Sequence, residues 1–198
     1  MPLTSYFGLA GCGLLCLALA ASMLRLEKRA ARVRCAVIVV AALALFVPIG
    51  DLPIVAYVRG VTGDLSAATL ALAGGALFFR LTGRVALERR EVNALLCLVL
   101  AAAAFLYPLA LGLTPFDPYG LGYGSIPFLT VLLLVTLAAW RAGLKLLVLV
   151  IVAGGLAFLA GAYESRNLWD YLIDPLAAIY ALVSLSIGAF RRGVKLAA

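Results

Sequence analysis

The chain has 198 residues, of which 66% are hydrophobic and only 13% are charged, and its mean hydropathy is +1.15. Soluble domains are about 45–50% apolar and about 25% charged, so this composition excludes a water-soluble enzyme. The chain contains no histidine. Its absence removes the commonest metal ligand and the usual general base at neutral pH, so we expect neither a metal site nor a cofactor. The net charge of +7 is spread over short loops, so we expect no nucleic acid as a partner.

Apolar runs between charged residues predict an all-α, polytopic membrane helix bundle with seven spans, forming one transmembrane domain over residues 1–198. A spanning helix needs roughly 20 apolar residues. As a single helix, residues 127–162 would reach about 54 Å, far beyond a hydrocarbon core of about 30 Å, so a turn at Gly143 is predicted. The predicted spans are 3–24, 35–50, 65–83, 92–113, 127–140, 145–162 and 175–190.

The distribution of basic residues predicts the orientation of these spans. Cytoplasmic loops are enriched in Lys and Arg. If the N-terminus lies outside, fourteen of the sixteen basic residues lie in cytoplasmic loops or the cytoplasmic tail, and only Arg59 and Arg166 lie outside. The fourteen are Arg25, Lys28, Arg29, Arg32, Arg34, Arg80, Arg84, Arg89, Arg90, Arg141, Lys145, Arg191, Arg192 and Lys195. We therefore predict an outer N-terminus and a cytoplasmic C-terminus.

Three connections lie on the outer side of this topology. Residues 50–64 are too short to span, and their apolar residues predict a short interfacial helix that Gly60 ends. Asp64 is then predicted to be the N-cap of the third span. Residues 114–125 are rich in Pro, Gly and aromatic residues, which is typical of an ordered turn. In the third connection, 163–175, Asp174-Pro175 is predicted to be the N-cap and first position of the last span.

Aromatic, acidic and arginine side chains in these connections form the candidate site. Arg59 and Arg166 are candidates to bind phosphate, because a guanidinium binds phosphate in a bidentate manner. Tyr119, Tyr123 and Trp169 are candidates to stack on a sugar, and Asp117 or Asp170 would be the base if the protein is an enzyme.

Structural roles explain the same residues as well. Tyr and Trp gather at membrane interfaces because they are amphipathic, and the aspartates can cap helices. Arg166 and Asp170 are four apart, which is the spacing of an ordinary helical ion pair.

These observations leave function open between three classes. The leading hypothesis is a small non-catalytic membrane subunit that packs against a larger membrane protein, or against further copies of itself, among membrane lipids. The alternative is a carrier or enzyme that acts at the outer leaflet on a lipid-linked substrate, such as a phospholipid or a polyprenyl-phosphate sugar. A channel or proton-coupled transporter requires a central charge, and Arg80 is the nearest candidate. The Ala-, Leu- and Arg-rich composition indicates a bacterial inner membrane.

Overall fold

The computed structural model describes residues 3–113 and 115–197, and most of these residues are helical. Thr114, which opens the predicted second connection, lies outside the described residues, as do residues 1, 2 and 198 of the predicted domain. The helices are α1 (Leu3–Met23), α2 (Ala31–Leu45), α3 (Ile54–Thr62), α4 (Ala67–Thr82), α5 (Arg89–Pro108), α6 (Ile126–Arg141), α7 (Lys145–Leu159), α8 (Leu168–Leu172) and α9 (Pro175–Ala197). Short turns are η1 (Leu26–Lys28), η2 (Leu109–Leu113) and η3 (Tyr119–Gly122), and β1 (Pro48–Ile49) pairs antiparallel with β2 (Leu52–Pro53).

Each predicted span overlaps one helix, although the second span extends past the end of α2 into β1, and the helical content confirms the all-α prediction. Two helices in the described part of the chain, Thr4–Met23 and Arg89–Gly112, are long and apolar enough to cross a membrane. Three more, Ala67–Thr82, Ile126–Arg141 and Lys145–Leu159, are apolar but shorter. At about 1.5 Å per residue, a helix of 15 or 16 residues reaches only about 22–24 Å, which is less than the hydrocarbon core.

Two predicted helix ends in the first connection are wrong. The short helix α3 continues through Gly60 to Thr62 and ends at Gly63, whose φ of +71° lies in the region that favours glycine. The N-cap of α4 is Ser66 rather than Asp64, since the Ser66 hydroxyl oxygen accepts from the Thr69 N–H at 3.3 Å. Asp64 is instead paired with Arg59.

The fourth predicted span is not a single regular helix to residue 113. Its regular part, α5, ends at Pro108, and the chain continues as the π-helical turn η2. Proline has no N–H to donate to the preceding turn, so the regular hydrogen-bond ladder cannot pass this position unchanged. Gly112 has a non-helical φ of +82°, so the helical geometry is interrupted just before the second connection.

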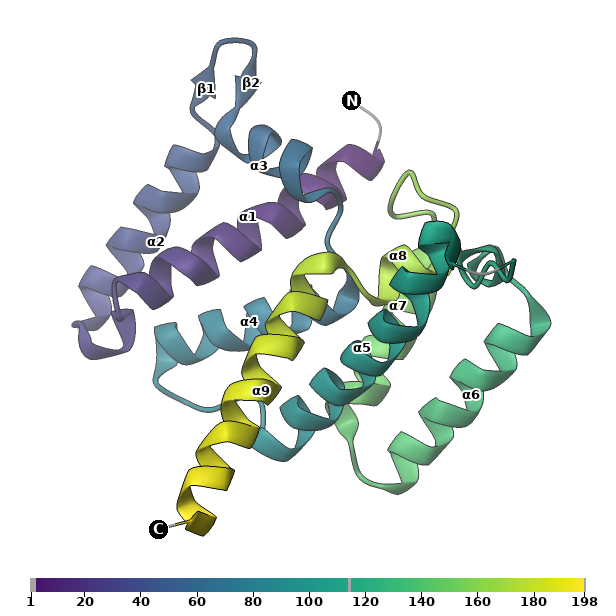
Figure 1. The fold of residues 1–198 in the computed structure, drawn as a ribbon. Coiled ribbons are helices and arrows are strands. Elements are labelled where there is room, and N and C mark those ends of the chain that lie inside the picture. The colour runs from purple at the N-terminus through teal and green to yellow at the C-terminus, as the bar shows by residue number, and fades with distance from the viewer. Residues whose placement is uncertain (1–2, 114, 198) are drawn as a thin grey trace.

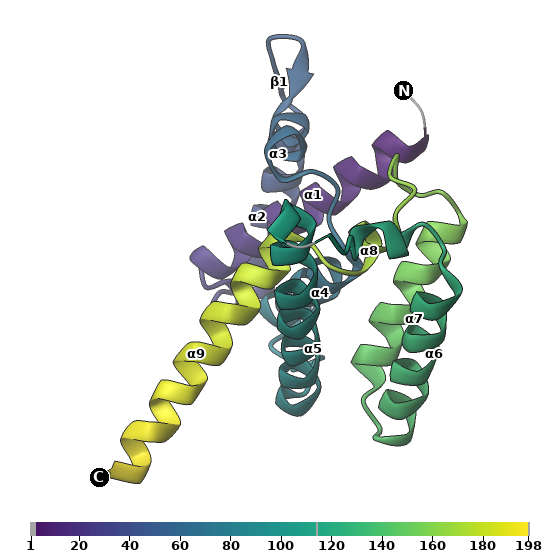
Figure 2. The same cartoon turned by 45° about the vertical axis from the view of Figure 1, so that its right-hand side comes forward.

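The connections divide between two ends of the molecule (Figure 1). The β1–β2 hairpin, α3, η2 and α8 lie near the N-terminus, whereas the turns after α1, α4 and α6 lie toward the other end with the C-terminus. The 46–66, 115–125 and 160–174 segments are called the loop face below. Figure 2 shows α6 beside α7 and α9 diverging from α5 toward its C-terminal end.

Two clusters of buried apolar side chains hold the helices together. The larger one joins α5, α7, α8 and α9 around residues such as Leu95, Val150 and Trp169. The smaller one joins α1, α3 and the start of α4 through Leu9, Cys12, Val55 and Leu65. Because the larger cluster includes α8, the loop face is packed onto the bundle rather than suspended above it.

Arg80 is the charged residue nearest the predicted membrane interior, and its contacts hold it toward the end of the molecule away from the loop face. Its Nη1 lies 2.7 Å from the Glu27 carboxylate, and its Nε donates to the Ser22 hydroxyl at 3.3 Å. The contact between Arg80 and the Glu27 carboxylate lowers the pKa of Glu27. Arg80 therefore ties α4 to the α1–α2 connection, and it does not stand alone in the bundle.

Asp174 joins the beginnings of two helices that are distant in sequence. Its Oδ1 accepts from the Ala177 N–H at 2.7 Å, which confirms that it caps α9. The same oxygen accepts from the Thr69 hydroxyl at 2.9 Å, and Oδ2 accepts from the Ser66 N–H at 2.8 Å, both in the first turn of α4. The Asp174 side chain is buried, with 5% of the residue exposed. The positive ends of two helix dipoles thus stabilise one buried carboxylate.

We predict that Asp174→Ala lowers the free energy of unfolding by about 3–5 kcal/mol, because it leaves the buried Ser66, Thr69 and Ala177 donors unpaired. Chemical denaturation of the detergent-solubilised protein, followed by circular dichroism, measures the change. Asp117→Ala is the control: Asp117 is exposed and caps one turn, so we expect less than about 1 kcal/mol. Equal losses in the two variants would contradict the bridging role of Asp174.

Candidate functional site

The candidate site occupies the loop face, and hydrogen bonds hold its three connections together. The Asn167 side-chain amide donates to the Tyr119 carbonyl oxygen at 2.8 Å, and Trp169 Nε1 donates to the Pro118 carbonyl oxygen at 3.0 Å. The Tyr163 hydroxyl donates to the Leu65 carbonyl oxygen at 2.6 Å. The third connection therefore holds both the second connection and the beginning of α4.

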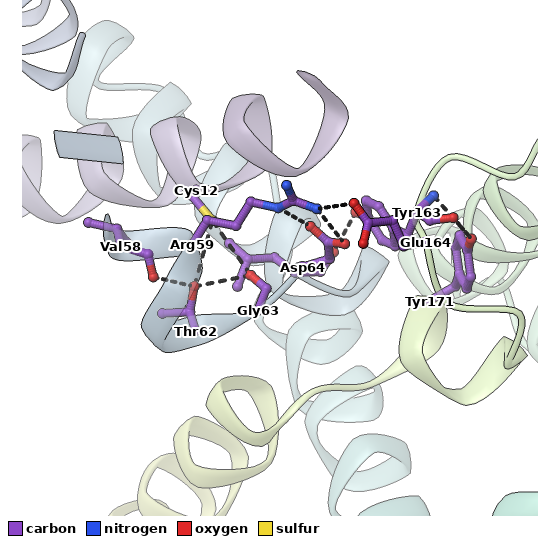
Figure 3. Close-up of polar contacts among 10 residues, drawn as sticks. Cys12, Val58, Arg59, Thr62, Gly63, Asp64, Tyr163, Glu164 and Tyr171 are labelled. Carbon is purple, nitrogen blue, oxygen red and sulfur yellow. Dashed lines mark hydrogen bonds and ion pairs between the residues drawn. The ribbon is translucent and has the colours of Figure 1, made fainter. Parts of the chain in front are cut away.

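Tyr163 and Tyr171 form the centre of the third connection. Their rings stack with centroids 4.8 Å apart, and the Tyr163 N–H donates to the Tyr171 hydroxyl oxygen at 3.1 Å (Figure 3). Burial, with a smaller contribution from the nearby Asp64 charge, raises the pKa of Tyr163 to about 12. Burial likewise raises the pKa of Tyr171. Both phenols therefore stay protonated at neutral pH and serve as hydrogen-bonding groups.

Arg59 lies beside Asp64 and is not presented to solvent as an open phosphate-binding group. Its Nε donates to Asp64 Oδ1 at 2.7 Å and its Nη2 donates to Oδ2 at 3.1 Å, so the guanidinium is bound in a bidentate manner (Figure 3). Glu164 adds a longer ion pair at 3.8 Å. The hydrogen bond to Asp64 raises the pKa of Arg59. This pair joins α3 to the start of α4 and passes against α1 at Gly8, where a Cβ atom would overlap both side chains.

Arg166 is exposed and takes no part in the Arg59 pair. Among the described residues it forms no ion pair with Asp170, because it precedes the N-cap of α8 at Asn167 and is not on the same helix. The predicted phosphate clamp of two arginines is therefore not assembled in this structure: Arg59 is occupied and Arg166 stands apart.

The predicted stacking residues have different environments. Trp169 is buried, with 7% exposed, and its ring centroid lies 4.3 Å from that of Phe128. Tyr123 is 63% exposed and contacts Tyr119 edge-to-face at 5.9 Å. Tyr119 donates its hydroxyl to Asp170 Oδ2 at 2.9 Å. Trp169 thus belongs to the core, and only the two tyrosines remain near the surface.

The two predicted carboxylate bases also separate. Asp117 Oδ1 accepts from the Tyr119 N–H at 2.9 Å and closes an exposed turn. Asp170 Oδ2 accepts from the Tyr119 hydroxyl and from the Ser165 hydroxyl at 2.5 Å. Burial and the neighbouring Asp170 carboxylate raise the pKa of Tyr119 to about 12.

A cavity of about 460 Å³ opens on the loop face between α5, α8 and the starts of α4 and α9. Asp170 and Tyr119 line it, together with Asp64, Asp174 and Tyr163. Sequence reasoning identified Asp64 and Asp174 only as helix caps, and it did not single out Tyr107, which also lines the cavity. The one signal for Tyr107 is its position before Pro108, at the point where α5 ends. The other residues that line the cavity are Thr62, Gly63, Leu106, Ala110, Ser165, Ile173 and Pro175.

The described residues of the candidate site do not form a set of metal ligands. Within residues 3–113 and 115–197, no group of three or more Cys, Asp or Glu side chains is placed to hold a metal ion. Comparison of this chain with models of protein families, with curated proteins and with solved structures gives no match.

We predict that Gly8→Ala is less stable than Gly13→Ala by about 1–3 kcal/mol. Both lie in α1, but a Cβ at Gly8 displaces the Arg59–Asp64 pair, whereas nothing lies within 4 Å of a Cβ at Gly13. Gly13→Ala should itself stabilise the helix by up to about 1 kcal/mol. Denaturation in detergent measures both variants. Replacing Arg59 and Asp64 with alanine should abolish the difference, and a difference that persists would exclude the ion pair as its cause.

Proposed function

We propose that this chain is a multi-pass integral membrane protein with seven spanning helices, placed in a bacterial inner membrane. The support is the amount of apolar surface that the fold leaves uncovered. Large apolar side chains protrude from most helices, among them Ile126 on α6, Leu159 on α7 and Phe190 on α9, each at least 75% exposed. Soluble monomers rarely expose contiguous apolar patches larger than a few hundred square ångströms. A hydrocarbon environment satisfies these side chains, and local bilayer thinning accommodates the shorter helices.

The distribution of charge supports an outer N-terminus in this proposal. The turns after α1, α4 and α6 carry most of the basic residues, and they lie toward the same end of the molecule as the C-terminus (Figure 1). The loop face carries Arg59, which is neutralised by Asp64, and Arg166. By the bias of cytoplasmic loops toward Lys and Arg, the loop face is the outer one.

We predict that reporter fusions after residues 60, 120 and 168 report an outer location, and that fusions after residues 30 and 86 report a cytoplasmic one. Paired alkaline phosphatase and green fluorescent protein fusions make the measurement, since the first is active only outside and the second fluoresces only inside. A cytoplasmic signal at residue 120 or 168 would overturn the seven-span topology.

Within the membrane, we propose that the protein is a non-catalytic subunit that packs against a larger membrane protein through α2. The observation that carries this proposal is that no residue of α2 is buried, although the helix is apolar around its circumference. Val40 and Leu43, for example, are 65% and 66% exposed. A helix that is apolar all round is buried in protein or surrounded by lipid, and α2 differs from the other proposed spanning helices in having no buried residue among those described, which favours a partner helix beside it. A partner helix against α2 supplies the close packing by which helices in membranes associate.

The loop face favours this role over action on a lipid-linked substrate. One candidate of each kind is used within the fold: Asp64 occupies Arg59, and Trp169 is packed on Phe128. The carboxylates of Asp117, Asp170 and Asp174 accept hydrogen bonds from the protein itself. These contacts make the loop face a rigid surface, which suits a subunit that presents this face to the cell envelope.

We predict that a photo-crosslinking amino acid at Val40 or Leu43 captures one and the same membrane protein in the native host. The same amino acid at Leu133, which is 58% exposed on α6, is the matched control and should capture lipid. Native mass spectrometry should find that protein at a fixed ratio to the chain, and Val40→Trp, but not Leu133→Trp, should reduce the ratio. Capture of lipid alone at both α2 positions, or of a second copy of this chain, would overturn the subunit role.

A further inference from the structure

The loop-face cavity has the size of a ligand site, and the charged side chains that line it are all acidic. Its volume of about 460 Å³ falls in the range of about 300–1,000 Å³ that is typical of small-molecule pockets. One part of the wall is apolar, formed by Leu106, Ala110, Ile173 and Pro175. The rest is polar, and among its described residues it includes three aspartates and three tyrosines but neither lysine nor arginine.

Two of the three carboxylates already have a positive partner within the fold. The guanidinium of Arg59 binds Asp64 in a bidentate manner. Asp174 lies at the N-termini of α4 and α9, where the aligned peptide dipoles provide the equivalent of about half a positive charge each. The charges of Asp64 and Asp174 are therefore compensated without a ligand.

Asp170 has no such partner. Its Oδ2 accepts from two neutral hydroxyl groups, those of Tyr119 and Ser165. Its Oδ1 accepts no hydrogen bond from the described residues, and no arginine or lysine among them forms an ion pair with it. The Asp170 carboxylate is partly buried and lines the cavity without a countercharge among the described residues, and partial removal from water makes such a charge costly. The cavity wall therefore carries one uncompensated negative charge, and a positive group that neutralises it would lie beside Asp170.

The aromatic groups around Asp170 suit an organic cation. Tyr107 and Tyr119 line the same cavity, and the Tyr107 hydroxyl makes no hydrogen bond with the described residues, so it is available as an acceptor. Ammonium groups bind favourably to carboxylates, hydroxyl oxygens and aromatic faces. A metal ion fits less well, because the described carboxylates do not form a cluster that would share one.

We propose that the loop-face cavity binds one organic ammonium ion, with its positive charge at Asp170 and its apolar part against Leu106, Ala110 and Ile173. The compensated carboxylates leave a single net charge, which indicates a monocation rather than a polyamine. This site is separate from the α2 surface, and its test uses the purified chain without a partner. Failure of one proposal therefore leaves the other standing.

Isothermal titration calorimetry of the full chain in uncharged detergent micelles tests this site, with n-hexylammonium as the probe and 1-hexanol as its neutral counterpart. We expect saturable binding of one hexylammonium per chain, and binding of hexanol at least tenfold weaker. Asp170→Asn keeps an oxygen for the Tyr119 and Ser165 hydroxyls but removes the charge, so it should weaken hexylammonium binding at least tenfold. Asp51→Asn removes an exposed aspartate of the β1–β2 hairpin and should leave binding unchanged.

Two further variants decide the result if Asp170→Asn does not fold. Tyr107→Phe removes a hydroxyl that makes no hydrogen bond with the described residues and should weaken binding a few fold without loss of stability. Ala110→Leu narrows the cavity and should reduce binding at least tenfold. Undiminished binding in both variants, equal binding of hexanol, absence of saturable binding in the unmodified chain, or displacement of the probe by stoichiometric Ca²⁺ or Mg²⁺ would each overturn the proposal.

Discussion

The buried carboxylate of Asp174 is the contact on which the arrangement of this protein most depends. One side chain accepts hydrogen bonds from the first turns of α4 and α9, which begin more than a hundred residues apart. The two helix dipoles stabilise its charge, and in return the charge fixes both helix starts at one point. Asp174 lies at the end of the third connection, so fixing this residue also restricts the position of α8 and the shape of the cavity.

Around that junction, the loop face is built like the interior of a soluble protein, although its elements are short. Asn167, Tyr163 and Trp169 satisfy backbone groups of neighbouring connections, and the rings of Tyr163 and Trp169 pack on the bundle. The helices show the opposite character, because their apolar side chains largely face outward. This contrast makes physical sense if the polar groups are internally paired at one end and the apolar flanks are covered by lipid and a partner.

Much of the helical framework could be predicted from the sequence, because the signals are local. Apolar runs bounded by charges located the seven longer helices but not α8, and Asp174-Pro175 correctly marked the start of α9. Helix ends were predicted wrongly where a second residue nearby was also suited to end or cap the helix. Gly60 resembles a helix end, but Gly63, three residues later, adopts the positive φ, and Ser66 takes the capping position expected of Asp64. The predicted phosphate clamp failed to assemble for a similar reason: Asp64 is five residues from Arg59, and the turn at Gly63 brings them together.

The sequence by itself determined the all-α fold class, the positions of the longer helices and the separation of charge between the two ends of the molecule, since each depends on composition or on neighbours within a few residues. Only the tertiary structure decided which carboxylates are compensated. Asp64, Asp170 and Asp174 look alike in the sequence, yet one meets an arginine, one meets two helix dipoles and one meets only neutral hydroxyl groups. The Arg59–Asp64 contact is local, but the environments of Asp170 and Asp174 depend on contacts between segments about 50 to 110 residues apart, and no local pattern records which groups a long chain brings together when its helices pack.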